Sequence, residues 1–181
     1  MKRALFLIPF LTFAFMPDAM SDGLETEIKS GNHCEDTIFK KFKLIHKTDH
    51  QMIKFAPSKK LLEFVTTMEL MCPWSVQRDF NGDKRDDWIG YVKSKNKYQL
   101  IVYMSGIRNY TLQTISESTE IPNNQFMRWL QTKHLKNFTD KRLKIGASKY
   151  AVQLVDIEDM TNIYLWNGKQ LEKVVTTSQI Y

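Results

Sequence analysis

The C-terminal part of the chain carries the pattern that most limits the fold. Three strand-like runs follow one another there, at 150–155, 162–166 and 170–176. Short runs rich in β-branched and aromatic residues, separated by turn residues, are typical of antiparallel strands. Asn167-Gly168 stands between the last two runs. This dipeptide predicts a two-residue type I′ turn, because both central positions of that turn need a positive φ. The sequence therefore predicts a C-terminal hairpin.

The middle of the chain predicts further strands. The run 98–104 alternates, with Leu100, Val102 and Met104 on one face, and a second run follows at 110–115. Two such runs separated by a Ser-Gly break indicate a meander. The sheet is therefore expected to be mainly antiparallel.

Helical spacing of apolar residues appears in three segments. The clearest is an amphipathic pattern that begins after Ser58, a good N-cap, and runs to about residue 71, where Pro73 follows. Less regular patterns cover 36–45 and 124–135. We predict an α+β fold: mainly an antiparallel sheet, made of a meander plus the C-terminal hairpin, with one to three helices.

The most specific chemical signal is the acidic stretch at 79–88. Positions 1, 3, 5, 7 and 9 of this stretch offer oxygen ligands, the seventh through its backbone carbonyl: Asp79, Asn81, Asp83, Arg85 and Asp87. A tight turn points alternate residues inward, and Ca²⁺ prefers about six to eight oxygens from carboxylates, amides, carbonyls and water. The stretch predicts a Ca²⁺ site. The alternative is an acidic Asn-Gly turn whose carboxylates are solvated.

The order D-x-N-x-D-x-x-x-D in this stretch resembles the calcium loops of FG-GAP and VCBS-type repeats, and more loosely those of dockerins and EF-hands. The resemblance implies a structural calcium ion between two strands. Lys84 stands at position 6, where the pattern usually has glycine, and Gly90 stands at position 12, where an EF-hand needs glutamate. The stretch occurs once, whereas a propeller needs several copies.

The N-terminus predicts export. Residues 1–21 have the form of a secretory signal peptide, with Lys2 and Arg3 before an apolar run and small residues before an expected cleavage site at Asp22. The apolar run is shorter than the roughly 20 residues that span a bilayer, although an uncleaved anchor is the alternative. We expect residues 22–181 to form one periplasmic or secreted domain without a transmembrane segment.

The chain has two cysteines, Cys34 and Cys72. Thiols of exported proteins usually pair, so we predict a Cys34–Cys72 disulfide. Such a bridge stabilises a fold by about 2–4 kcal/mol. A nucleophilic cysteine is the alternative, but no neighbouring residue marks either thiol as activated.

The charge balance limits the class of partner. The formal net charge is +6, and the basic residues are scattered rather than gathered in one block. Nucleic acid is a poor partner for an exported protein, so we expect another protein, for instance in the cell envelope.

The sequence contains no G-x-S-x-G, no H-E-x-x-H and no phosphate-binding glycine loop. His46 and His50 have a spacing that suits zinc, with exposed polar side chains as the alternative reading. Four carboxylates leave acid–base chemistry open: Glu117, Glu120, Glu158 and Asp159.

These observations predict a non-catalytic exported binding protein with a structural calcium loop. One version is an inhibitor or immunity-type protein that blocks a cell-envelope enzyme. The alternatives are a small envelope hydrolase that uses Asp or Glu carboxylates, and a carbohydrate-binding module that uses exposed Trp and Tyr side chains beside the ion.

Overall fold

A computed structural model describes residues 37–53, 56–68, 70, 72–106, 110–137 and 148–177. Helices and strands follow in the order α2 (Thr37–His46), β1 (Gln51–Met52), α3 (Lys59–Thr67), β2 (Ser75–Arg78), β3 (Asp87–Ser94), β4 (Lys97–Met104), β5 (Thr111–Ser118), β6 (Gln125–Gln131), the 3₁₀ helix η2 (Thr132–Asn137), β7 (Tyr150–Asp156), β8 (Thr161–Trp166) and β9 (Leu171–Thr177). The predicted signal peptide at 1–21 lies outside the described residues.

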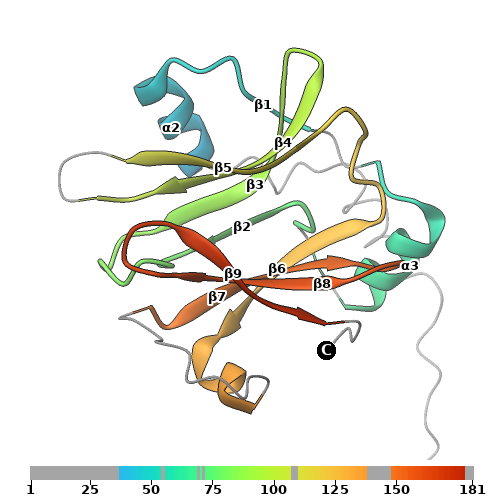
Figure 1. Cartoon of the computed structure of the whole chain (residues 1–181). Coiled ribbons are helices and arrows are strands. Elements are labelled where there is room, and N and C mark those ends of the chain that lie inside the picture. Colours follow the sequence, from blue (N-terminus) through green and yellow to red (C-terminus); the bar gives the residue numbers. More distant parts are fainter. Residues whose placement is uncertain are drawn as a thin grey trace, which may run out of the picture.

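The strands form two antiparallel sheets (Figure 1). The first sheet has the order β1-β3-β4-β5, with β2 also paired to β3, and the second has the order β6-β7-β8-β9. The α+β class with mainly antiparallel sheet is therefore confirmed. The predicted strands at 98–104, 110–115 and in the C-terminal region all exist.

Strand β3 organises the first sheet. One of its edges pairs with β4, and the other is shared by two strands placed end to end: β2 along 87–90 and β1 at 92–93. Because Arg78 pairs with Asp87, β2 and β3 form a hairpin whose connection is the acidic stretch.

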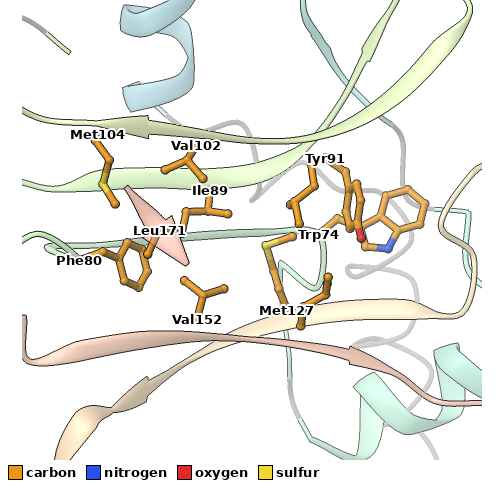
Figure 2. Packing of buried hydrophobic residues seen from close by; sticks show 11 residues of the cluster. Trp74, Phe80, Ile89, Tyr91, Val102, Met104, Met127, Val152 and Leu171 are labelled. Atoms are coloured by element: carbon orange, nitrogen blue, oxygen red, sulfur yellow. The ribbon is translucent and has the colours of Figure 1, made fainter. Parts of the chain in front are cut away.

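The inner faces of the two sheets pack against each other (Figure 2). The first sheet contributes Ile89 and Tyr91 from β3, with Leu100, Val102 and Met104 from β4; the second contributes Met127, Val152, Leu154 and Leu171. Phe80 of the acidic stretch is fully buried in this core. Burial at this site anchors the start of the connection between β2 and β3, because removing a buried phenylalanine side chain costs about 3–5 kcal/mol.

A glutamine side chain also joins the sheets. The Gln113 amide of β5 donates to the Leu171 carbonyl oxygen at 2.9 Å and accepts from the Leu171 N–H at 3.0 Å. This amide therefore hydrogen-bonds the first residue of β9 as a neighbouring strand would.

Both predicted N-terminal helices exist and cover outer faces. Helix α2 packs Phe39 and Phe42 onto Trp88 and Tyr103 of the first sheet. The side-chain oxygen of Ser58, the predicted N-cap, accepts the Leu61 N–H at 3.2 Å. Helix α3 ends at Thr67, earlier than the predicted residue 71, and packs against the second sheet.

The helix predicted over 124–135 is wrong. Residues 125–131 form strand β6, and η2 follows. Both faces of β6 are covered: Met127 faces the core between the sheets, while Phe126 packs against α3. Adjacent buried residues on opposite faces, followed by a partly buried Leu130, produced an apolar spacing that also fits a helix.

The predicted two-residue turn is also wrong. Trp166 pairs with Leu171, so the connection comprises four residues, 167–170. Gly168 has φ +98°, but Asn167 is not among the described residues with positive φ. Instead, the Asn167 side-chain oxygen accepts the N–H groups of Lys169 and Gln170, each at 2.9 Å. This asparagine stabilises the loop as an Asx-type cap.

Gly90 is required by its neighbour. A Cβ at this position of β3 would lie 2.4 Å from two ring carbons of Trp88, which is fully buried. We predict that Gly90→Ala destabilises the fold by about 1–3 kcal/mol through overpacking, measured by urea denaturation. Trp88→Phe removes those ring carbons, so the double variant should lose less stability than the sum of the single variants. Additive losses would contradict this packing.

Candidate functional site

The acidic loop, defined here as residues 79–86, connects the paired ends of β2 and β3. Asp79 opens this loop, and its carboxylate accepts three backbone N–H groups: Gly82 at 2.6 Å, Asp83 at 3.1 Å and Lys84 at 2.9 Å. The backbone therefore wraps around the Asp79 carboxylate, which satisfies N–H groups that have no partner in a ladder.

The next two alternate residues repeat this arrangement on a smaller scale. The Asn81 side-chain oxygen accepts the Asp83 N–H at 2.9 Å, and Asp83 Oδ1 accepts the Arg85 N–H at 2.9 Å. These are successive Asx turns, in which a side-chain oxygen bonds the backbone two residues on. Alternate oxygen-bearing residues therefore direct the chain of the acidic loop.

The loop makes its sharp turn with lysine where the calcium-loop pattern has glycine. Lys84 has φ +67° and Gly82 has φ +84°, both in the left-handed region. A non-glycine residue adopts that region at a cost of about 1–2 kcal/mol. Its neighbours therefore hold Lys84 in the conformation that glycine usually supplies.

Asp87 fastens the acidic loop to the first sheet. This side chain is fully buried at the start of β3. Its Oδ2 accepts the Phe80 N–H at 2.7 Å and the Asn81 N–H at 3.2 Å, and its Oδ1 accepts the Ser105 N–H at 2.6 Å and hydroxyl at 2.7 Å. Burial raises the pKa of Asp87 to about 6, against the opposing effect of these hydrogen bonds. One carboxylate thus joins the loop, β3 and the end of β4.

Arg85 lies across the outer side of the loop. Its guanidinium contacts Asp83 Oδ2 at 3.0 Å and donates to the Gly106 carbonyl oxygen. The Ser105 hydroxyl also lies 2.9 Å from Asp83 Oδ1, so its one proton is shared between Asp83 and Asp87. Burial acts to raise the pKa of Asp83, but the hydrogen bonds from Ser105 and Arg85 together hold it below its usual range.

The predicted calcium ligands therefore divide into two groups. Asp79, Asn81 and Asp83 lie on the loop and accept hydrogen bonds from its backbone, whereas the Asp87 oxygens are occupied by donors from the loop and from Ser105. Within the described ranges, no group of three or more His, Cys, Asp or Glu side chains is arranged to hold a metal ion. The first group, with the Arg85 carbonyl, is the part of the predicted set that fits Ca²⁺, which accepts amide, carbonyl and water ligands beside carboxylates.

The other sequence predictions receive partial answers. Cys72 is not a free thiol, but Cys34 lies outside the described residues, so their pairing stays a prediction.

His50 is neither exposed nor placed for zinc: it is buried, with Nδ1 3.0 Å from the Tyr103 hydroxyl. Burial lowers the pKa of His50. The His46 ring stacks on the Tyr103 ring, with 5.6 Å between the two ring centroids.

A second candidate site is a cleft of about 370 Å³ where the two sheets meet. We call it the inter-sheet cleft; its lining residues are Tyr91, Tyr98, Ser116, Glu117, Ser118, Glu120, Ile121, Pro122, Asn123, Asn124, Gln125 and Asp156. They come from β3, β4, β5, the segment before β6, the first residue of β6, and β7. The volume falls in the range of about 300–1,000 Å³ that is usual for small-ligand sites.

A short chain of hydrogen bonds forms part of the wall of the inter-sheet cleft. The Tyr91 hydroxyl donates to the Gln125 side-chain oxygen, and the Gln125 amide nitrogen donates to Asp156 Oδ2 at 3.0 Å. Trp74 Nε1 donates to the Gln125 carbonyl oxygen at 2.7 Å. Burial raises the pKa of Tyr91, and the nearby Tyr164 and Asp156 add to this effect. Gln125 therefore has its side chain fixed between the sheets.

Of the four carboxylates that the sequence left open for acid–base chemistry, two line the cleft. Glu117 and Glu120 line it, and Glu158 accepts from the Asn124 amide at 2.6 Å, but Asp159 is not in the lining. Glu117 pairs with Lys97 and accepts from Gln99 at 2.8 Å, and these hydrogen bonds lower its pKa. Such a carboxylate stays ionised and is a poor general acid.

Tyr91, Gln125 and Asp156 were not identified from the sequence as site residues. They belong to strands of different sheets, and no sequence spacing connects them. For Gln125 and Asp156 the only signal is a polar residue at the end of an otherwise apolar run, which also describes ordinary strand ends, and Tyr91 lies inside a strand like any core tyrosine.

Comparison with known proteins finds no family model, curated protein or solved structure that matches this chain. Of the helices in the described parts of the chain, none has the length and apolar character needed to cross a membrane.

The hydrogen bonds of Asp87 generate a prediction about stability. Asp87→Ala leaves the buried Ser105 and Phe80 N–H groups without their acceptor, so we expect a loss of roughly 3 kcal/mol or more in the free energy of unfolding. Urea denaturation measures it. Asp86→Ala is the matched control, because the neighbouring Asp86 is exposed and, among the described residues, its side chain bonds only the amide of the partly exposed Gln77. Equal losses in the two variants would contradict the anchoring role of Asp87.

Proposed function

We propose that this chain is an exported, non-catalytic binding protein whose partner is another protein of the cell envelope. The signal-peptide pattern at 1–21 and the predicted pairing of two cysteines support export. The inter-sheet cleft supports ligand binding, because it is a concave site lined by polar and aromatic groups on strands of both sheets.

The proposal that the protein is non-catalytic rests on the hydrogen-bond partners of the Glu117 carboxylate. The Lys97 ammonium and the Gln99 amide both bond this carboxylate, which lies in the cleft lining. Glycoside hydrolysis needs one carboxyl group with a raised pKa as the proton donor. Among the described carboxylates, the one whose pKa is raised is Asp87, which is fully buried among its own hydrogen-bond donors. Binding accounts for the cleft better than turnover.

One specific version is an inhibitor or immunity-type protein that blocks a cell-wall-degrading enzyme. A rigid β-scaffold suits this role, because a preorganised surface loses little conformational entropy on binding. The double-sheet core and the anchored acidic loop supply that rigidity.

We further propose that Ca²⁺ binds the acidic loop and stabilises the β2–β3 connection. The alternation of Asp79, Asn81 and Asp83, the Asx turns and the left-handed Lys84 support this assignment. When bound, the ion would cross-link loop oxygens. Its role would be structural.

The calcium assignment predicts a ligand-dependent shift in stability. The melting temperature of the mature protein should rise from EDTA to millimolar Ca²⁺, because a ligand at 100 times its Kd stabilises the folded state by about 2.7 kcal/mol. Asp79→Ala and Asp83→Ala should lose most of that shift. Asp159→Asn, an exposed carboxylate outside the loop, should retain it. No shift in the parent protein would reduce the acidic loop to a turn held by its own hydrogen bonds.

The inhibitor version predicts stoichiometric loss of enzyme activity. The mature protein should be titrated into a panel of purified cell-wall-degrading enzymes, with turbidity of a peptidoglycan suspension as the readout and size-exclusion chromatography to detect a complex. Inhibition that saturates at a fixed molar ratio supports the proposal. Turnover of peptidoglycan by the protein itself, lost in Glu117→Gln or Glu120→Gln, would instead identify a hydrolase.

A carbohydrate-binding module is the second candidate, because a partly exposed aromatic side chain contacts the residue that precedes the acidic loop. Trp129 is 37% exposed, and the Arg78 guanidinium, which directly precedes the loop, lies 4.7 Å from its ring centroid. Tyr150 contacts the same ring edge-on at 5.4 Å. Saturable binding to an isolated glycan, abolished by Trp129→Ala, would favour this candidate.

A further inference from the structure

The inter-sheet cleft is acidic in a protein that is basic. The whole chain has a formal net charge of +6, yet the cleft lining holds Glu117, Glu120 and Asp156 and no Lys, Arg or His. Lys97 compensates one of these charges through its ion pair with Glu117. A concave site between low-dielectric walls concentrates the field of the remaining carboxylates. The cleft therefore favours a cation over the anions that the rest of the molecule attracts.

Two carboxylates of the lining retain hydrogen-bond acceptor capacity. The Gln125 amide nitrogen already donates to Asp156, and the Asn124 amide nitrogen already donates to Glu158. The Asp156 oxygens accept one bond each, at 3.0 Å, and the Glu120 carboxylate has no side-chain partner among the described residues. Since an ionised carboxylate has about four lone-pair sites, these two groups retain acceptor capacity. A ligand that brings N–H donors can therefore bond Glu120 and Asp156, beside the hydroxyl and amide groups that also line the cleft.

The remaining lining suits an alkyl chain that ends in a cation. Tyr91, Ile121 and Pro122 provide apolar surface, and Tyr98 provides an aromatic ring. The Lys93 ammonium lies 5.9 Å from the Tyr98 ring centroid, close to the limit of about 6 Å for a cation–π contact, so a ligand cation at this ring would take the place of Lys93. Long basic side chains bury their methylene groups on apolar surface and keep the charged end in contact with polar groups.

We propose that the inter-sheet cleft binds the side chain of a lysine or arginine presented by the protein partner, with Glu120 and Asp156 accepting from its ammonium or guanidinium. This inference rests on the proposed function, since it identifies the group that the binding protein recognises. Glu120 lies in the connection from β5 of the first sheet to β6 of the second, and Asp156 ends β7 of the second sheet, while Tyr91 and Tyr98 of the lining belong to the first sheet. The site therefore depends on the packing of the two sheets.

The test is a titration of the mature protein with small probes, in which its ¹⁵N chemical shifts report binding. The probes are a blocked pentapeptide with one lysine between glycines and the same peptide with norleucine, which lacks the ammonium group. We expect saturable shifts near Tyr98 and Gln125 with the lysine peptide, with a Kd of about 1 mM, and none with the norleucine peptide. High salt should weaken the binding because the carboxylates are accessible to solvent. Equal shifts with both peptides would overturn the proposal.

The variants assign the shifts to the cleft. Glu120→Gln removes one charge from an exposed side chain, and Asp156→Asn keeps the shape of its side chain. Each should lower the affinity for the lysine peptide about two- to fivefold, the range expected for a solvent-exposed ion pair. Glu172→Gln is the matched control, because Glu172 is an exposed carboxylate on β9 that is not in the cleft lining and bonds Asn167. Equal weakening in the control would reduce the effect to overall charge and overturn the site.

The same titration separates this proposal from the proposed function. Cadaverine, a free diamine, serves as a third probe. Binding of the lysine peptide together with failure of every enzyme in the inhibition assay would retain the cleft and reject the inhibitor version. Binding of cadaverine at least tenfold tighter than the lysine peptide would overturn the assignment to a protein side chain in favour of a free amine. Absence of saturable shifts with all probes would reject the cleft, whether or not an enzyme is inhibited.

Discussion

The Asp87 carboxylate is the interaction on which the local order of the β2–β3 region depends. It accepts N–H groups from Phe80, Asn81 and Ser105, and so it joins the acidic loop to the strand that β1, β2 and β4 all contact. Phe80 then enters the core between the sheets, directly beside the hydrogen-bonded backbone. Hydrogen bonds to a charged group contribute more than those between neutral groups, about 1.5–3 kcal/mol each. The highly charged acidic loop is therefore fixed to the first sheet by a buried attachment.

The rest of the frame follows from strand β3, because its two faces have different partners. Ile89 and Tyr91 face the second sheet, while Trp88 and Val92 face helix α2. Gly90 leaves the space that the Trp88 ring occupies. This two-sided burial places the first sheet between α2 on its outer side and the second sheet on its inner side (Figure 1). The inter-sheet cleft is at a rim of the inner interface, where residues from both sheets converge.

The oxygens of the acidic loop and those of the cleft differ in how many of them already have hydrogen-bond partners within the chain. In the loop, the oxygens of Asp79, Asn81 and Asp83 already bond the backbone, so a cation would add to an arrangement that the chain itself has formed. In the cleft, by contrast, the Glu120 carboxylate has no side-chain partner in the described part of the chain. We therefore infer a structural role for the loop and a recognition role for the cleft. A fixed frame that holds carboxylates in a concave site is suited to binding.

The sequence by itself determined the local elements: the Ser58 cap, the alternation of β4, and the positions of the C-terminal strands, because caps and two-residue periodicity depend on neighbours along the chain. It also placed the turn at 79–88 and its alternating oxygens. It misassigned β6, since Phe126 and Met127 are buried on opposite faces and only their tertiary partners distinguish strand from helix. The tertiary structure alone decided that Asp87 is a buried anchor. It alone placed Glu120, Gln125 and Asp156 around one cleft, because strand pairing and sheet packing bring together residues that no local spacing relates.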